Sequence, residues 1–180
     1  MNRTILLLAY VFLWVSACSP PERSTHEEQT VDVSGQDARP VPSCYLFTTD
    51  RDTVYLVLDP PKAGKITGEL GYDFYERDGN IGFIEGEVQG DTLIADYTFL
   101  SEGMVSVREV GFLLGEDEVI EGYGDVDEVD GRMVFWHKDS LDFSNGLMMS
   151  KVPCGQLRRV DYLQFFPDSI IEQRERRTEK

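Results

Sequence analysis

The stretch DGNIGFIEGEVQGDTLIADYTF, residues 78–99, decides the fold class. It contains two runs rich in β-branched, aromatic and other apolar residues, 81–88 and 92–99, with the turn pair Gly90-Asp91 between them. Runs of this kind on either side of a turn pair are typical of two antiparallel strands in a hairpin. Asp78-Gly79, just before the first run, predicts another tight turn, because these residues tolerate positive φ.

The same pattern continues in both directions along the chain. Turn signals at intervals of about 8–12 residues and short connections predict an all-β, mainly antiparallel domain. We expect either a single meander barrel or a strongly curved sheet, placed at residues 43–155. Ser169-Ile170-Ile171-Glu172 resembles a helix capping box, so we expect a short helix within the C-terminal segment 156–180. The other predicted strands are 44–49, 53–58, 65–75, 105–114, 118–123, 132–136 and 146–152.

The charge balance excludes one class of partner. The 180 residues carry 33 acidic and 17 basic side chains, for a net charge of −16. A nucleic-acid partner is excluded, because binding to a phosphate backbone needs clustered Lys and Arg. The acidic excess lies in residues 18–155, with 28 acidic and 10 basic side chains, whereas the segment 156–180 is nearly neutral.

The N-terminus has the layout of a secretory signal. Arg3 precedes an apolar run, Ile5 to Val15, which is too short for a membrane span of about 20 apolar residues. Val15-Ser16-Ala17-Cys18 resembles the lipobox of bacterial lipoproteins, in which the chain is cut before a cysteine that takes lipid, including an acyl chain such as palmitate. This resemblance implies a signal peptide at residues 1–17 and lipidation of Cys18. The alternative is an ordinary signal peptide with an incidental cysteine.

The predicted cellular location follows from the same resemblance. Lipidated Cys18 would hold the protein to the membrane, and no other segment predicts a span. Ser19 favours the outer membrane, facing the periplasm or the exterior, because an Asp after the cysteine is the retention signal for the inner membrane in some bacteria. Residues 18–42 are rich in Pro, Ser, Thr and Glu, which predicts a disordered tether.

Two cysteines remain, Cys44 and Cys154, one at each end of the predicted β-domain. In an exported protein this number predicts one disulfide, and the alternative is two buried free thiols. No CxxC pair or paired histidines accompany them, so we expect no metal site. We find no phosphate-cradling glycine loop, dinucleotide motif or nucleophile elbow, so we expect no cofactor and no catalytic residues.

Several stretches of the β-domain resemble a group of small lipoproteins common in Bacteroidota. They include Gly71–Gly82, Gly90–Phe99, Ser106–Val110 and Glu121–Gly124, and the resemblance covers about residues 44–154. The resemblance implies a location in the cell envelope, but it does not imply any biochemical activity. It also marks the stretch from Tyr97 to Arg108 as the first place to look for a site.

Arg108 is the only basic residue between Arg77 and Arg132. In such an acidic domain it has two interpretations, a structural ion pair with Glu102 or Glu121, or an anchor for an anionic ligand inside the barrel. The candidate ligand-binding residues are therefore Tyr97, Glu102, Arg108 and Glu121.

The aromatic residues of the strands also have two interpretations. Core filling is the default, and the alternative is a cavity like that of a lipocalin. They are Tyr72, Phe74, Tyr97, Phe99, Phe112, Tyr123, Phe135 and Trp136.

Acidic residues give two weaker signals. Asp125–Gly131 resembles a calcium loop but lacks the EF-hand spacing, so we interpret it as a solvated hairpin turn with Asp130-Gly131 as its turn pair. A different kind of cation site there stays open as an alternative. Paired carboxylates could hydrolyse a glycan. The candidates are Glu69, Glu76, Glu85, Glu87, Glu102, Glu109 and Glu121.

We therefore expect a lipid-anchored envelope lipoprotein with a non-catalytic binding or envelope-maintenance role. Its partner would be a small molecule or another envelope protein. One alternative is a glycan or peptide hydrolase that uses paired carboxylates. Another is an inhibitor of a basic hydrolase such as lysozyme, which the acidic surface would attract.

Overall fold

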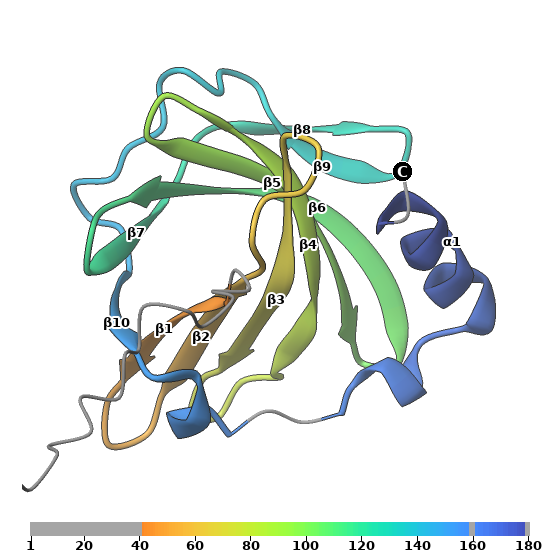
Figure 1. Ribbon diagram of the computed structural model, residues 1–180. Helices are drawn as coiled ribbons and strands as arrows, with labels where there is room; N and C mark the ends of the chain where they lie inside the picture. Colours follow the sequence, from red (N-terminus) through yellow and green to blue (C-terminus); the bar gives the residue numbers. More distant parts are fainter. Residues whose placement is uncertain (1–40, 159–160, 179–180) are drawn as a thin grey trace, which may run out of the picture. The chain divides into compact units, whose positions relative to one another are not determined.

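A computed structural model describes residues 41–158 and 161–178 (Figure 1). The signal peptide, Cys18 and all of the expected tether except Val41 and Pro42 lie outside these residues. None of the helices in the described part has the length and apolar character that a bilayer crossing requires. The strands are β1 (Ser43–Thr48), β2 (Thr53–Leu58), β3 (Lys65–Asp73), β4 (Asn80–Gln89), β5 (Thr92–Ser101), β6 (Met104–Leu114), β7 (Glu118–Gly122), β8 (Val126–Val129), β9 (Arg132–Phe135) and β10 (Met148–Val152). The helical segments are the 3-10 turns η1 (Cys154–Gln156) and η2 (Leu163–Phe165) and the helix α1 (Asp168–Thr178).

Eight strands close into an antiparallel barrel. Strands β1 to β7 each pair with the next along the chain, and β10 fills the place between β7 and β1. The long hairpin of β5 and β6, whose partners run from Thr92↔Leu113 to Ser101↔Met104, belongs to the same closed wall. The barrel is thus a meander until β7, as expected, and of the two expected forms the closed one is present. The β8–β9 hairpin lies outside the ring of eight and reaches β6 through one parallel bridge, Arg108↔Met133.

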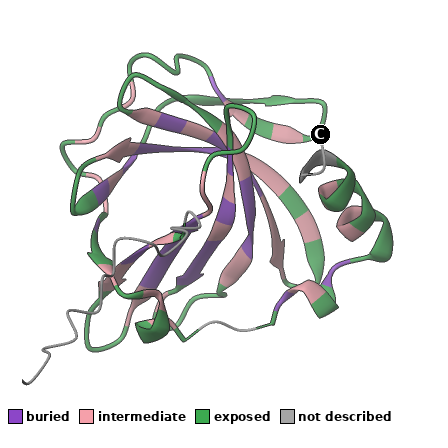
Figure 2. Ribbon diagram, in the orientation of Figure 1, coloured by how far each residue is buried: buried purple, intermediate pink, exposed green. Residues whose placement is uncertain are grey.

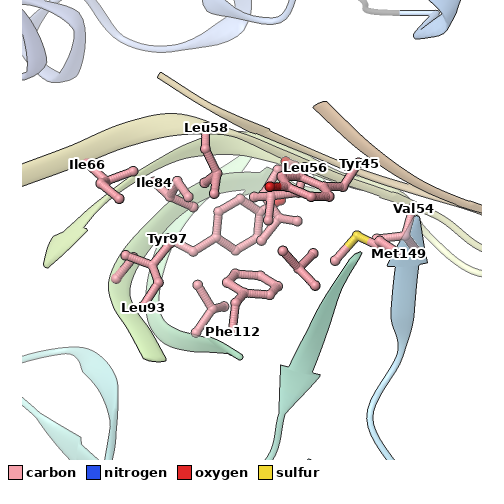
Figure 3. Packing of buried hydrophobic residues seen from close by; sticks show 14 of the residues in the cluster. Tyr45, Val54, Leu56, Leu58, Ile66, Ile84, Leu93, Tyr97, Phe112 and Met149 are labelled. Carbon is pink, nitrogen blue, oxygen red and sulfur yellow. The ribbon is translucent and has the colours of Figure 1, made fainter. Parts of the chain in front are cut away.

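Side chains fill the barrel interior (Figure 3). Along β5, buried Leu93, Ala95 and Tyr97 alternate with half-buried residues, as a strand with one inward face requires. An internal cavity would leave accessible surface on the side chains that line it, yet many of the interior side chains have none. An eight-stranded barrel is just narrow enough for side chains to fill. A lipocalin-like cavity is therefore absent around the residues with 0% exposure, namely Val54, Leu56, Leu70, Leu93, Tyr97, Phe112, Val119 and Met149.

The C-terminal segment covers part of the outer face of the barrel (Figures 1 and 2). The disulfide between Cys44 and Cys154 is present, and its cysteines pack with outward-facing Tyr55 and Val57 of β2. Farther along, Tyr162 and Phe166 pack on Phe83 of β4. The expected helix is therefore present as α1, next to a segment that extends the hydrophobic packing of the barrel wall.

Local details differ from the sequence expectations at three places. The Asp130-Gly131 turn is as predicted, with φ of 51° and 75° at the two residues. By contrast, the positive φ between β3 and β4 falls on Glu76 (57°) and not on Asp78-Gly79, so a longer turn joins these strands. Strand β8 was not expected, because its four residues are all exposed and two of them are acidic. Ser169 lies inside α1, which begins at Asp168, so it is not the residue that caps the helix.

Candidate functional site

The register of the strands places Arg108 on the inner face of the barrel. Arg108 of β6 lies directly opposite Tyr97 of β5, and antiparallel partners project to the same face of a sheet. Tyr97 is fully buried in the core, so Arg108 points inward as well. This pair lies near the middle of the β5–β6 ladder, while Phe99 and Tyr72 lie closer to the end of the barrel that carries the β1–β2, β3–β4 and β5–β6 turns, which we call the barrel mouth.

Three aromatic rings surround the guanidinium of Arg108. Its Cζ atom lies 5.3 Å from the ring centroid of Tyr72, 5.5 Å from that of Tyr97 and 5.4 Å from that of Phe99. Each distance is within the range of a cation–π contact. The three rings form a connected group, with Tyr97 stacked on Phe99 at 4.8 Å and tilted against Tyr72 at 6.0 Å. The cation therefore sits in an aromatic frame that is partly shielded from water.

Arg108 forms no ion pair with Glu102 or Glu121, and both carboxylates belong to the described part of the chain. Its Nε atom is buried and has no hydrogen-bond partner. Glu102 is exposed in the β5–β6 turn with a φ of 52°, and no contact joins it to the cluster. The expected structural ion pair is thus not formed, and the side chain as a whole is half-buried at the mouth.

Glu121 supplies the negative charge of the same region. It lies on β7 opposite Phe112, which is fully buried, so its side chain also points inward, and it is 5% exposed. The hydroxyl of Tyr72 donates a hydrogen bond to Oε1 at 2.6 Å, and that of Tyr123 donates to Oε2 at 3.3 Å. Burial raises the pKa of Glu121, while these two hydrogen bonds and the charge of Arg108 oppose that rise.

The phenols of the cluster act as donors. Burial raises the pKa of Tyr72 well above its ordinary value, and the charge of Glu121 raises it further. Burial likewise raises the pKa of Tyr97, whose hydroxyl donates to the Leu70 carbonyl at 3.0 Å. Burial and Glu121 raise the pKa of Tyr123 to about 12. All three hydroxyls therefore keep their protons at neutral pH, and Glu121 is the group of this cluster that can exchange one.

The structure thus brings together three of the four predicted residues, Tyr97, Arg108 and Glu121, and leaves Glu102 apart. Tyr72, Phe99 and Tyr123 complete the cluster. The sequence marked these three only as aromatic residues of strands. The period-two alternation of the strands could have predicted that Tyr72 and Phe99 point inward. Their contact with Arg108 could not be predicted in this way, because it depends on the closure of the barrel.

The other buried carboxylate, Glu109, has a structural role. Its neighbours in β6, Arg108 and Val110, point inward, so Glu109 points outward. It accepts a hydrogen bond from the backbone N–H of Phe135 at 2.9 Å and pairs with Lys138. Glu109 and Glu121 therefore lie on opposite faces of the barrel wall. They do not form the facing pair of carboxylates that glycoside hydrolysis requires.

The acidic stretch Asp125–Gly131 belongs to the β8–β9 hairpin and does not enclose a site. Throughout residues 41–158 and 161–178, no group of three or more His, Cys, Asp or Glu side chains is arranged to hold a metal ion. His137 stacks beside the exposed Trp136 at 5.8 Å between ring centroids. The Arg108 cluster therefore remains the candidate site.

Comparisons with protein-family models, with curated proteins and with solved structures find no match to this chain.

Proposed function

We propose that this chain is a lipid-anchored lipoprotein of the bacterial envelope with a non-catalytic binding role, and that its barrel mouth binds a small anion at Arg108. The proposal rests on the environment of the Arg108 side chain. The side chain is half-buried, framed by three rings, without an ion pair, and its Nε has no acceptor. A shielded cation without a direct ion-pair partner is costly, and an anionic ligand that pairs with it reduces that cost.

The packed interior limits where this ligand lies. Because Tyr97 and Phe112 are fully buried against their neighbours, a ligand has no room deep in the barrel. It must stay at the mouth, where Arg108, Phe99 and the half-exposed Tyr123 are within reach of solvent. An anionic head group with a compact apolar body fits this combination of one cation and several aromatic rings.

Calorimetric titration of the full-length protein in a non-ionic detergent tests the binding proposal. The probes are benzoate, benzenesulfonate and phenylphosphate, with benzamide as a neutral control. We expect at least one of the anions to bind and benzamide not to bind. Replacing Arg108 by methionine, which keeps an unbranched apolar stem but removes the guanidinium and its charge, should abolish binding.

Arg132 provides the matched control, because it is a cation outside the mouth that is paired with Asp96. Arg132→Met should bind the anionic probes as the wild type does. The proposal is wrong if Arg108→Met retains the wild-type affinity, or if none of the three anions binds to the wild type.

The lipid anchor has a separate test. Wild-type protein expressed in a bacterial host should partition with membranes and carry acyl mass in mass spectrometry. Cys18→Ser should lose both properties. Membrane partitioning of Cys18→Ser without acyl mass on either protein would contradict the lipoprotein assignment and leave the ligand proposal unaffected.

A further inference from the structure

We propose that the ligand of the barrel mouth is a monocarboxylate and that its binding is coupled to the uptake of one proton by Glu121. This inference rests on the proposed binding function and adds the ligand class and the regulation of the same site. In the bound state the ligand carboxylate faces Arg108, and a proton from solvent forms an O–H bond on the carboxylate of Glu121. The net event is the uptake of a neutral acid, so charge and protons balance.

The position of Tyr72 supports the coupling. The ring of Tyr72 lies beneath the guanidinium of Arg108, with 5.3 Å between the ring centroid and Cζ. The hydroxyl of the same side chain donates a hydrogen bond to Oε1 of Glu121 at 2.6 Å. The two opposite charges therefore belong to one cluster without forming an ion pair. A ligand carboxylate that pairs with Arg108 brings a second negative charge close to Glu121, and two carboxylates in a shielded site favour protonation of one of them.

Glu121 is the group able to take the proton, because none of the ionisable groups around it can do so. The ionisable groups that face it are Tyr72 from β3, Tyr97 from β5, Arg108 from β6 and Tyr123 after β7. The phenols already hold their protons, and Arg108 is permanently charged. The segment before β10 approaches through the Leu147 carbonyl, which accepts the backbone N–H of Glu121.

Asp142, in the segment between β9 and β10, exchanges backbone hydrogen bonds with Tyr123. Its carboxylate is exposed and accepts hydrogen bonds from the backbone N–H and the hydroxyl of Ser144. These bonds lower its pKa, so it stays ionised near neutral pH. It does not compete for the proton.

The charge count of the site favours a monocarboxylate over a more highly charged anion. Arg108 supplies one guanidinium on the inner face, and its planar fork matches a planar carboxylate in a bidentate pair. A phosphate dianion would leave one negative charge unmatched beside Glu121. The net charge of the whole chain, −16, also repels multiply charged anions.

Titration of full-length protein with benzoate between pH 5.5 and 8 tests the inference. We expect the affinity to fall as pH rises, by up to about tenfold per pH unit. Repeating the calorimetry in buffers with different ionisation enthalpies measures protons directly, and should show uptake of up to about one proton per benzoate bound. This second measurement needs no variant.

Glu121→Gln should bind benzoate with an affinity that does not depend on pH and without proton uptake. Glu85→Gln is the matched control, since Glu85 is paired with Lys65, away from the mouth cluster, and it should behave like wild type. Wild-type binding of benzoate with neither pH dependence nor proton uptake overturns the coupling but leaves the binding function intact. Equal or tighter binding of phenylphosphate overturns the monocarboxylate class, whereas a complete lack of anion binding overturns the proposed function itself.

Discussion

Tyr72 is the residue that organises the barrel mouth. Its ring contacts Arg108, and its hydroxyl donates to Glu121. Both contacts use the amphipathic character of tyrosine, which presents an apolar body for packing and a polar tip for hydrogen bonding. Because the hydroxyl bonds to a buried carboxylate, this hydrogen bond belongs to the stronger, charge-assisted class.

Replacing Tyr72 by phenylalanine should therefore be costly. The ring and its packing remain, but the buried carboxylate of Glu121 loses its shorter hydrogen bond. We expect the free energy of unfolding at pH 7 to fall by about 1.5–3 kcal/mol, measured by urea denaturation. Tyr123→Phe is the control, because Tyr123 is half-exposed and its bond to Glu121 is 3.3 Å long. Equal stability of Tyr72→Phe and wild type would contradict the role of this hydrogen bond.

The buried carboxylate also predicts a pH dependence of stability. Burial raises the pKa of Glu121 in the folded chain above its value in the unfolded chain. The folded state then holds this proton more tightly, so its contribution to stability is complete at low pH and is lost as pH rises through the folded-state pKa. Glu121→Gln removes this titration.

We expect the stability of Glu121→Gln relative to wild type to increase as pH rises above the ordinary glutamate range. The change is at most about tenfold in the unfolding equilibrium constant per pH unit. Denaturation curves of both proteins at several pH values measure it. A difference that stays constant with pH would show that Glu121 does not titrate over this range.

At the scale of elements, the β8–β9 hairpin depends on one buried side chain. A single parallel bridge joins it to β6, so backbone pairing alone holds it weakly. Glu109 adds an acceptor for the Phe135 N–H and a partner for Lys138, while Arg132 pairs with Asp96 at 2.9 Å. Of these contacts, those of Glu109 are the most buried.

Glu109→Ala should leave the Phe135 N–H without an acceptor. We expect a loss of about 1–3 kcal/mol in the free energy of unfolding, together with faster hydrogen exchange at Phe135. Arg132→Ala is the control and should cost about 0–1 kcal/mol, because its ion pair is only partly buried, with the two side chains 42% and 26% exposed. Unchanged exchange at Phe135 in Glu109→Ala would indicate that other contacts hold the hairpin.

Strand β4 shows how the barrel wall bends. At Gly82 a Cβ atom would lie 2.0 Å from the Thr98 carbonyl oxygen of β5, so the two backbones approach too closely for a side chain. Gly86 makes the same approach to Ile94 at 2.1 Å. Glycines at such positions allow the strong curvature that closing a small barrel requires.

Gly82→Ala should force β4 and β5 apart. We expect a loss of about 1–3 kcal/mol in stability by urea denaturation, because the crowding atom is backbone and cannot rotate away. Gly155→Ala has open space around the new methyl group and should change stability by less than about 0.5 kcal/mol. Similar stability of the two variants would contradict the close approach at Gly82.

At the scale of the whole molecule, the disulfide reinforces barrel closure. Cys44 lies in β1 and Cys154 follows β10, and these two strands are neighbours in the wall. The bridge spans a sequence separation of 110 residues. It therefore fixes the start and the end of the barrel sequence together in the unfolded chain as well as in the folded one.

Reduction of this bridge should lower stability. In the chain-entropy description, a loop of this length contributes roughly 4–5 kcal/mol. We expect a clearly lower Tm in the presence of a reductant, and the double variant Cys44→Ser, Cys154→Ser should melt at that lower temperature in either condition. A wild-type Tm that does not respond to the reductant would contradict the contribution.

The sequence by itself determined the all-β class, the approximate positions of nine strands, the C-terminal helix and the cysteine pairing. It could do so because composition, period-two alternation and turn residues are local properties of the chain. Prediction failed where the local composition was typical of a turn and the chain nevertheless formed a strand. Strand β8 is acidic and exposed, so nothing in its composition distinguishes it from the solvated turn that we expected there.

Only the tertiary structure showed that Arg108 forms no ion pair with Glu102 or Glu121. Tyr72 and Glu121 are 49 residues apart in sequence, and they meet because β3 and β7 face one another across the closed barrel. Alternation predicts which residues point inward, but not which inward residues from distant strands share a level. That depends on the register and the curvature of the whole wall. Closure placed three aromatic rings around Arg108, and the proposed anion site rests on that arrangement.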